Sequence, residues 1–328
     1  MKIIAVEEHW SHPLNKGIRE EFEKRSDSVP TVFPGTYKEY FTRMTTEAVE
    51  DYRLKEMDEA GIAMQILSHA YPGIQGILHP AEAVEKAKII NDDLAEIIRK
   101  HPTRFKGFAA LPMQDPKAAA DELERCVKDY GYLGALINGQ TNGEFLDEDK
   151  FRIVWERSAE LGVPIYLHPS DPVSGQVKAY EGFPMMLGPA WSWNVETATN
   201  AMRIIYSGLF EEIPGATLII GHMGEMLPYL LGRIDEGYWQ KGGPESWKIK
   251  REPSYYIKKN MMISTSGMWN IETLVCAVSA MGADRILFSV DYPYVDSNWT
   301  VSQVQKSPIS EEDKEKIFFG NAKKLFGL

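Results

Sequence analysis

The feature that most constrains the fold is a regular alternation between short apolar segments and longer amphipathic segments. Eight apolar, β-prone runs recur along the chain. Most are continuously apolar, as expected of strands that are covered on both faces. We expect strands at residues 3–8, 64–69, 105–111, 133–138, 164–168, 216–222, 261–266 and 286–291. Helical patterns lie between them, which is the signature of β–α units.

The segments between the strands have apolar residues at three- and four-residue spacing, with charged residues on the opposite face. The expected helices cover residues 46–60, 81–100, 116–129, 149–161, 196–210 and 270–281. Gly61, Gly131 and Gly162 each follow such a helix directly, where a left-handed C-cap favours glycine.

Eight such alternations in 328 residues fit a (β/α)8 barrel, the TIM-barrel fold, better than an open doubly wound sheet. No GxGxxG motif follows the first strand, which argues against a dinucleotide-binding fold. Two segments rich in proline, glycine and aromatic residues, 11–45 and 168–194, follow the first and fifth strands and would cover the barrel mouth. With no internal repeat or low-complexity linker, one domain over residues 1–328 is expected.

Composition and charge narrow the class of protein. The chain is 44% hydrophobic and 25% charged, as soluble globular proteins are, and its net charge of −11 argues against binding nucleic acid or an acidic membrane. The N-terminal apolar run ends at Glu7, too soon for a signal peptide or a membrane span. Cys126 and Cys276 have no partner at metal-ligand or CxxC spacing, so buried thiols in a reducing cytoplasm are expected.

Polar side chains gather at one end of the expected strands. The carboxyl ends carry Glu7, His9, Asn138, His168, His222 and Asp291. Barrel active sites are built at this face, and polar groups there are costly to bury unless they are paired or bound to a metal. Each residue alone has an ordinary explanation, such as a hydrogen-bonded pair, a core histidine or an aspartate that caps a turn. The convergence of five of them on one rim of the barrel favours a metal site. These five are Glu7, His9, His168, His222 and Asp291.

The residue types of this cluster also indicate its metal. Mixed imidazole and carboxylate ligands suit Zn²⁺ or Mn²⁺. No lysine ends the fourth strand, where a carboxylated lysine would bridge two metals, so a single ion is expected. Among the other histidines, His69 ends the second strand and could line the pocket, whereas His12, His79 and His101 are expected to be surface or structural residues.

A series of motifs extends over nearly the whole chain. In order, these are EEHW, RLKEMDEAGI, FAALPMQDP, GALINGQ, YLHP, LGPAWSW, SGLFEEIPG, IIGHMGEMLPY, STSG and DRILFSVDYPY. Together they resemble the amidohydrolase superfamily, and within it the metal-dependent decarboxylases of ortho-hydroxybenzoates such as γ-resorcylate (2,6-dihydroxybenzoate). Most superfamily hydrolases begin with His-x-His, whereas this chain carries Glu7-x-His9, as the decarboxylase branch does. The resemblance implies a carboxy-lyase that removes CO₂ without oxidation and reversibly.

The resemblance also implies roles for the strand-end residues. The metal ligands would be Glu7, His9, His168 and Asp291. Asp291 would also protonate the ring carbon that bears the carboxylate, because direct loss of CO₂ would leave an unfavourable aryl anion. His222 and Glu225 would form a pair beside the substrate, since residues three apart on a helix opening after the sixth strand share a face.

Further residues are implied to contact the substrate. These are Asn138, Trp191, Arg233 and Tyr294. Trp193 is expected to line the same aromatic pocket as Trp191 and Tyr294. Arg233 lies 11 residues after His222, roughly 16 Å along a helix. It is therefore either a surface arginine or part of a neighbouring subunit's pocket, since related enzymes are dimers or tetramers. Segment 11–45 and the motif DYPY depart from the family pattern, which leaves the ring substituents open.

Two other interpretations remain. One is a metal-dependent hydrolase or hydratase of a cyclic or dicarboxylic substrate on the same scaffold, against which Glu7 and the missing lysine argue. The other is a non-catalytic barrel that serves as a binding protein, against which the intact polar strand ends argue.

Overall fold

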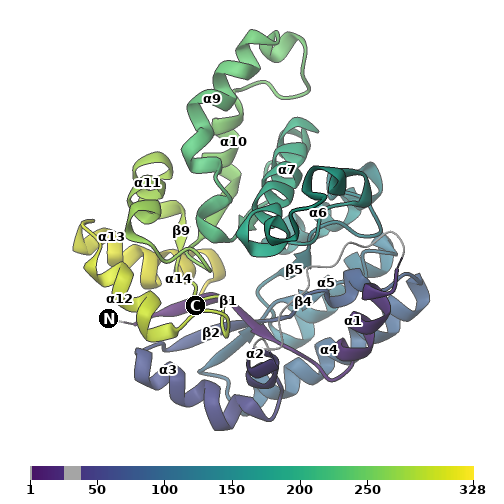
Figure 1. Ribbon diagram of the computed structural model, residues 1–328, viewed down its shortest axis with the longest axis vertical. Helices are drawn as coiled ribbons and strands as arrows, with labels where there is room; N and C mark the ends of the chain where they lie inside the picture. The colour runs from purple at the N-terminus through teal and green to yellow at the C-terminus, as the bar shows by residue number, and fades with distance from the viewer. Residues whose placement is uncertain (1, 26–37) are drawn as a thin grey trace.

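The computed structural model describes residues 2–25 and 38–328, and parallel strands form a barrel at its centre (Figure 1). The strands are β1 (Ile4–Trp10), β2 (Met64–His69), β3 (Phe105–Gly107), β4 (Ala109–Ala110), β5 (Ala135–Asn138), β6 (Ile165–His168), β7 (Leu218–Ile220), β8 (Met261–Ser264) and β9 (Ile286–Leu287). Every expected strand is present, although the third is divided at Phe108 into β3 and β4. The (β/α)8 fold is therefore confirmed.

Backbone hydrogen bonds close the ring of strands. The order is β1-β2-β3 in one parallel sheet and β4 to β9 in the other. At the division, the amide of Phe108 donates to the carbonyl of Leu67 at 2.9 Å. At the other seam, the amide of His9 donates to the carbonyl of Tyr292 at 2.9 Å. This second seam brings the two segments that carry Glu7, His9 and Asp291 side by side.

An irregularity in β1 decides which of its side chains face the barrel interior. Ile4 and Val6 belong to the apolar cluster inside the barrel, but the pairing register with β2 shifts between Ala5 and Glu8. An extra residue in a strand reverses its alternation. Beyond the shift, Glu7 and His9 therefore face inward, while Trp10 packs in the outer layer between strands and helices.

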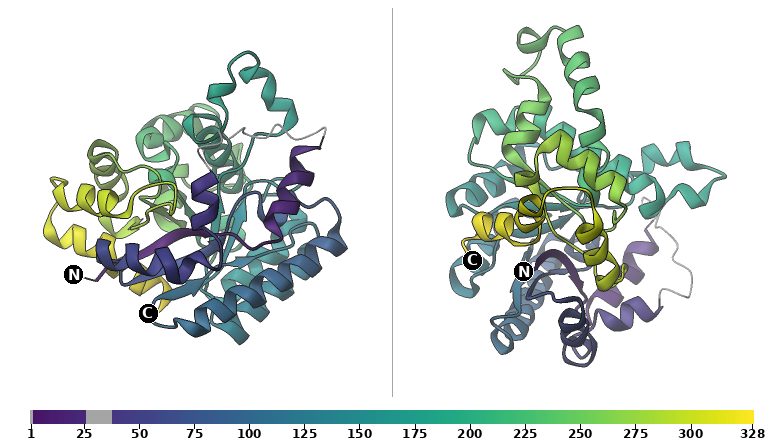
Figure 2. Two further views of the ribbon diagram at one scale, coloured as in Figure 1. Left: turned by 60° about the horizontal axis from the view of Figure 1, so that its bottom comes forward. Right: turned by 90° about the vertical axis from the view of Figure 1, so that its left-hand side faces the viewer.

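Helices surround the barrel (Figure 2). The longer ones are α1 (Asn15–Glu23), α3 (Leu54–Ala60), α4 (Pro80–Lys100), α5 (Pro116–Tyr130), α6 (Arg152–Leu161), α7 (Ser192–Tyr206), α9 (Leu227–Gln240), α10 (Pro253–Asn260), α11 (Ile271–Met281) and α12 (Ser297–Lys306). Shorter ones are α2 (Lys38–Arg43), α8 (Leu209–Glu212), α13 (Glu311–Glu315) and α14 (Asn321–Phe326).

The expected helix boundaries need three corrections. The helix expected over 46–60 consists of a π-helical turn, Val49–Arg53, followed by α3. The helix expected over 196–210 begins earlier, at Ser192, and ends at Tyr206, and α8 follows it. The helix expected after the sixth strand is α9, which begins only at Leu227, whereas α10 was not expected; both extend away from the barrel in Figure 1. The left-handed C-caps at Gly61, Gly131 and Gly162 are confirmed.

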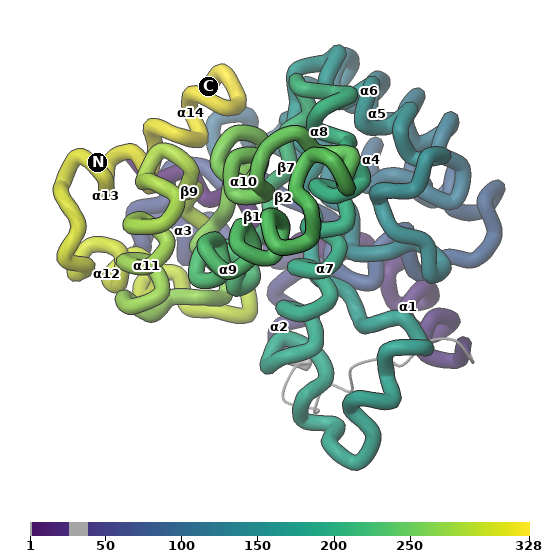
Figure 3. The backbone as a smooth tube through the Cα atoms, turned by 90° about the horizontal axis from the view of Figure 1, so that it is seen from above, coloured from purple at the N-terminus to yellow at the C-terminus, as the bar shows by residue number. Residues whose placement is uncertain are grey.

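The two long insertions occupy the same end of the molecule. The described part of segment 11–45 contains α1 and α2. The segment after β6 forms three short 3-10 helices before α7, and it projects from the barrel in Figure 3. Cys126 is buried as expected, but Cys276 on α11 is only partly buried. None of the described helices is long and apolar enough to cross a membrane.

Candidate metal centre

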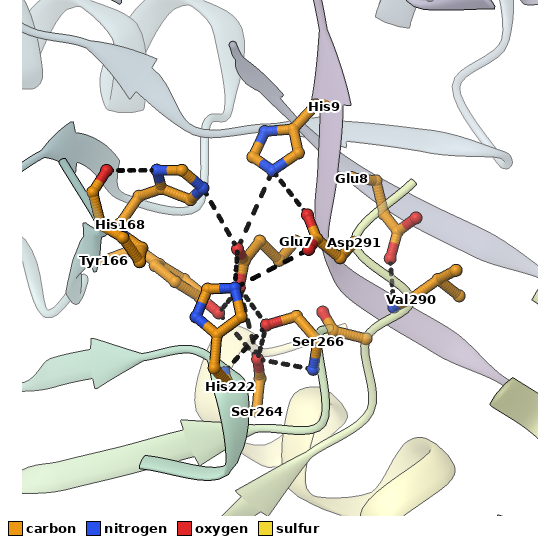
Figure 4. A network of polar contacts seen from close by, with 12 residues as sticks. Glu7, Glu8, His9, Tyr166, His168, His222, Ser264, Ser266, Val290 and Asp291 are labelled. Atoms are coloured by element: carbon orange, nitrogen blue, oxygen red, sulfur yellow. Dashed lines mark hydrogen bonds and ion pairs between the residues drawn. The ribbon is translucent and has the colours of Figure 1, made fainter. Parts of the chain in front are cut away.

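One carboxylate oxygen lies at the centre of the polar cluster (Figure 4). Glu7 Oε1 is 3.8 Å from His9 Nε2, 3.6 Å from His168 Nε2 and 3.8 Å from His222 Nε2. Within the described part of the chain, this buried oxygen has no hydrogen-bond partner. The three imidazoles come from β1, the end of β6 and the turn after β7, so the barrel closure brings them together.

Asp291 completes the cluster on the side of β9. Its Oδ1 lies 3.0 Å from His9 Nε2, and its Oδ2 lies 3.7 Å from His222 Nε2. Its backbone has φ 73°, a left-handed conformation that non-glycine residues rarely adopt outside functional sites. Burial alone would raise the pKa of Asp291, but hydrogen bonds from His222 and His9 outweigh burial and lower this pKa below its usual range.

The positions of protons indicate that this cluster fits a cation. His168 Nδ1 lies 2.9 Å from the carbonyl oxygen of Pro169, so Nδ1 carries the proton and donates it. Burial, with repulsion from His9 and His222, lowers the pKa of His168 well below the usual value, which keeps the ring neutral. Its Nε2 lone pair then faces Oε1 of Glu7 at 3.6 Å. An imidazole lone pair that faces a carboxylate oxygen in this way suits a divalent ion with nitrogen and oxygen ligands.

Two overlapping groups have their ligand atoms within 4.8 Å of one another: Glu7, His9 and His168, and Glu7, His222 and Asp291. The predicted ligands Glu7, His9, His168 and Asp291 are all among them. His222 is also within this set, so geometry alone does not separate it from the ligands.

Glu7 is held by residues that were not predicted from the sequence. Its second oxygen, Oε2, accepts hydrogen bonds from the Tyr166 hydroxyl and, at 2.5 Å, from Ser266 Oγ, with Ser264 Oγ at 3.5 Å. Burial and the charge of Glu7 raise the pKa of Tyr166, which keeps its hydroxyl protonated as a donor. Tyr166 lies two residues before His168 on β6, and this spacing was a usable signal because alternate strand residues share a face.

A second buried network lies outside the barrel wall. Glu8 Oε1 accepts a hydrogen bond from the amide of Val290 at 2.9 Å, and Glu8 Oε2 accepts one from Gln65 Nε2 at 3.1 Å. Arg53 donates to Gln65 Oε1 at 3.0 Å and to the carbonyl oxygen of His9. This network ties the backbone of β1 to the residue before Asp291. Burial raises the pKa of Glu8 to about 8, against the opposing effects of the Val290 amide and Arg53.

His222 and Glu225 are paired as predicted, but not on a helix. His222 Nδ1 lies 2.6 Å from Glu225 Oε1. The segment is a tight turn in which His222, Met223 and Glu225 have φ of 50°, 54° and 49°, and α9 begins only at Leu227. The helix predicted for His222 and Glu225 is therefore wrong, and a turn places the two side chains together instead. Burial alone would lower the pKa of His222, but Glu225 and Glu7 outweigh it and raise this pKa well above the usual value.

A cavity of about 240 Å³ opens above the cluster. It is lined by His9, Arg19, Tyr71, His168, Pro169, Pro189, Trp193, Asn194, His222, Glu225, Gly267, Met268, Asp291, Tyr294 and Val295. Tyr294 and Trp193 line it as expected. Arg19, Tyr71 and Met268 were missed: Tyr71 and Met268 lie on loops whose course the sequence pattern does not define, and Arg19 lies on α1, a helix within segment 11–45 that was not expected.

Three of the expected substrate-binding residues lie elsewhere. Asn138 borders a separate small polar cavity. Trp191 does not line the main cavity and is 48% exposed. The Arg233 side chain is 77% exposed on α9 and forms an ion pair with Glu236 at 2.9 Å, outside this chain's own cavity.

The remaining histidines contribute little to the cavity. His69 is buried but does not line it, and burial, with repulsion from His12, lowers the pKa of His69 to about 3. His12 is also buried and forms a hydrogen bond with Asp93 at 2.8 Å, which supports a structural role. His101 contacts Glu50 at 3.1 Å near the surface.

Comparison with known proteins places this site in a family. The amidohydrolase family model matches residues 12–328. The chain is 42% identical to the γ-resorcylate decarboxylase of Polaromonas sp. strain JS666, over 99% of this chain and 98% of that protein. It is also 42% identical to the γ-resorcylate decarboxylase of Rhizobium sp. strain MTP-10005, with the same coverage.

Solved structures agree. A 2,6-dihydroxybenzoate decarboxylase in complex with 2,6-dihydroxybenzoate superposes with a TM-score of 0.92 at 39% identity, covering all of both chains. A dihydroxybenzoic acid decarboxylase from Polaromonas sp. JS666, with bound manganese and the inhibitor 2-nitroresorcinol, gives a TM-score of 0.90 at 38% identity, covering 100% of this chain and 97% of that one. The chain belongs to the amidohydrolase family, in its branch of metal-dependent decarboxylases.

Proposed function

We propose that this protein catalyses the reversible, non-oxidative decarboxylation of an ortho-hydroxylated aromatic carboxylic acid of the γ-resorcylate type. The observation that carries the proposal is the unpartnered Glu7 Oε1, which faces three imidazole Nε2 atoms at the base of a cavity lined by aromatic side chains. The activities named for the relatives support the same reaction.

One divalent ion, Zn²⁺ or Mn²⁺, would be held by Glu7, His9, His168 and Asp291. When bound, it would supply Lewis-acid stabilisation of the negative charge on the substrate oxygens. The Tyr166 hydroxyl and Ser266 hold Glu7 Oε2, which leaves Oε1 without a hydrogen-bond partner among the described residues, so that it would be the oxygen that binds the ion.

Asp291 is the proposed proton carrier. Its low pKa means that it is ionised before substrate binds, so it must first receive a proton. The ortho hydroxyl of the substrate would give up that proton as it ionises. Asp291 would then deliver it to the ring carbon that bears the carboxylate. The carbon–carbon bond would then break, its electron pair would restore the aromatic ring as a phenolate, and CO₂ would leave. The phenolate oxygen would take up a proton from water, so that overall one proton replaces one CO₂.

His222 would orient the substrate carboxylate. Glu225 Oε1 accepts a hydrogen bond from His222 Nδ1 and fixes the ring, so the other ring nitrogen, Nε2, faces Glu7 and Asp291. Trp193 and Tyr294 would pack against the aromatic ring of the substrate.

Arg233 suggests an oligomer. Because its exposed side chain does not line its own main cavity, we propose that it enters the pocket of a neighbouring copy in a homodimer or homotetramer. Location in the cytoplasm and organisation as one domain over residues 1–328 also remain proposals from the sequence, as do substrate contacts by Asn138 and Trp191.

The proposal is tested by a panel of hydroxybenzoates assayed for CO₂ release, with metal analysis of the same preparation. We expect turnover only of acids with a hydroxyl ortho to the carboxylate, and one metal ion per chain. Turnover of para-hydroxybenzoate alone would contradict the role given to the ortho hydroxyl. Hydrolysis of lactones or amides without CO₂ release from any salicylate would favour the hydrolase interpretation.

A further inference from the structure

Two aromatic side chains from distant parts of the sequence form one wall of the cavity. Tyr71 lies after β2 and Trp193 lies in the first turn of α7, and their ring centroids are 5.4 Å apart at an angle of 52°. The Trp193 ring also meets the ring of His168 edge-on, with centroids 6.1 Å apart. We call Tyr71 and Trp193 the aromatic wall. It reaches from the cavity to one of the predicted metal ligands.

Both rings of the aromatic wall are hydrogen-bonded to the same carboxylate. Asp171 is 3% exposed and lies three residues after His168. The Tyr71 hydroxyl donates to its Oδ2 at 2.8 Å, and Trp193 Nε1 donates to its Oδ1, also at 2.8 Å. Burial and Asp171 together raise the pKa of Tyr71 well above its usual value, so the phenol retains the proton that it donates.

Asp171 itself does not line the main cavity. It borders the small polar cavity behind the wall, together with Gln75 and Asn138, and this cavity of about 20 Å³ has room for about one water molecule. Tyr71 borders both cavities. Arg19 donates to the carbonyl oxygen of Tyr71 at 2.8 Å, which holds its backbone. The phenol ring is therefore the part of Tyr71 that is able to tilt toward the space behind it.

We propose that Asp171 is a specificity-determining positioning residue, which holds Tyr71 and Trp193 with one carboxylate oxygen each. In this way it sets the width of the substrate slot, which is the part of the main cavity beside the aromatic wall. The kind of ligand that fills the slot, a planar aromatic acid, rests on the proposed function. With the carboxylate in place, the wall is fixed and the slot fits a flat, lightly substituted ring. Without it, both donors lose their shared acceptor, the wall relaxes, and the slot accepts bulkier rings while binding small ones less well.

The test compares Asp171→Asn and Asp171→Ala with Tyr71→Phe and Trp193→Phe, and uses Tyr52→Phe on the half-exposed π-helical turn as a matched control. We expect Asp171→Ala to raise the KM for 2,6-dihydroxybenzoate, and the Kd for 2-nitroresorcinol, by roughly tenfold, with kcat changed less than about threefold and metal content unchanged. The preference for that acid over one with an added ring methyl group should fall. Asp171→Asn, which keeps one acceptor oxygen, should have an intermediate effect.

Coupling between variants provides a check that needs no ligand. If Asp171 acts through the Tyr71 hydroxyl, Tyr71→Phe should lower Tm in the wild-type background and have almost no further effect in Asp171→Ala. Additive Tm changes would overturn the inference. So would a fall in kcat or metal content with KM, Kd and ring preference unchanged. Because this cycle does not depend on turnover, it tests the inference even if no hydroxybenzoate is decarboxylated, an outcome that would instead overturn the proposed function.

Discussion

The loop after β8 carries a glycine that packs directly against the metal centre. Gly267 has φ 63°, and a Cβ atom at this position would lie 2.7 Å from His222 Cδ2 and 3.0 Å from Asp291 Oδ2. Ordinary contact begins near 3.4 Å, so the Gly267→Ala substitution must displace the imidazole by about 0.7 Å. Misplacing a catalytic group by about 1 Å costs roughly 100-fold in rate. We therefore expect kcat/KM for 2,6-dihydroxybenzoate to fall by roughly 30- to 100-fold.

Gly131→Ala is a matched control that separates backbone strain from displacement of His222. Gly131, the C-cap of α5, has φ 69°, but a Cβ atom there would meet nothing within 4 Å. Alanine in the left-handed conformation costs about 1 kcal/mol at either position, or roughly 2 °C in Tm for a chain of this size. Gly131→Ala should show this loss of stability with unchanged kcat/KM. If Gly267→Ala retained the activity of Gly131→Ala, the placement of His222 and Asp291 around the site would be wrong.

Three further predictions follow from individual side chains. Tyr166→Phe removes a hydrogen bond to Glu7 Oε2 and should weaken metal binding about 10- to 100-fold in competition with a chelator. Unchanged affinity for the metal would argue against a role of Tyr166 in positioning Glu7. Asp291→Asn should lower kcat by about 100-fold or more, because an amide cannot carry the proton, and its metal content should be measured on the same sample. Burial and two neighbouring carboxylates raise the pKa of Glu196 from 4.5 to about 8. Between pH 4.5 and about pH 8, Glu196 keeps its proton in the folded chain and releases it in the unfolded chain, so the free energy of unfolding falls as pH rises. Glu196→Gln should reduce this fall by up to about 1.4 kcal/mol per pH unit, measured by urea unfolding at several pH values. An equal dependence of the free energy of unfolding on pH in the wild type and the variant would contradict this prediction.

The barrel could be predicted from the sequence because its strands are covered on both faces and therefore appear as continuous apolar runs. The ligands were found for a related reason, since a polar residue at the end of an apolar strand stands out. The register shift in β1 could not be predicted. Nothing in the sequence marks the point where the inward-facing set changes from Ile4 and Val6 to Glu7 and His9, because that change depends on pairing with β2.

The parts of the site that were missed depend mostly on loops. Tyr71 and Met268 reach the cavity from segments with no regular secondary structure, and Arg19 reaches it from α1, a helix that was not expected. The turn from His222 to Glu225 also differs from the expected helix, because all four of its residues have positive φ and periodicity carries no information about such a conformation. Side-chain chemistry at strand ends was therefore predictable, whereas the shape of the cavity above them was not.

The most direct test of the central claim is decarboxylation of 2,6-dihydroxybenzoate by the metal-loaded protein in D₂O, followed by nuclear magnetic resonance of the product. We expect equal amounts of CO₂ and resorcinol, with one deuterium on the carbon between the two hydroxyls, and loss of both products in Asp291→Asn. Failure of the metal-loaded wild-type protein to release CO₂ from this acid or any other ortho-hydroxybenzoate would contradict the account. So would full activity in Asp291→Asn.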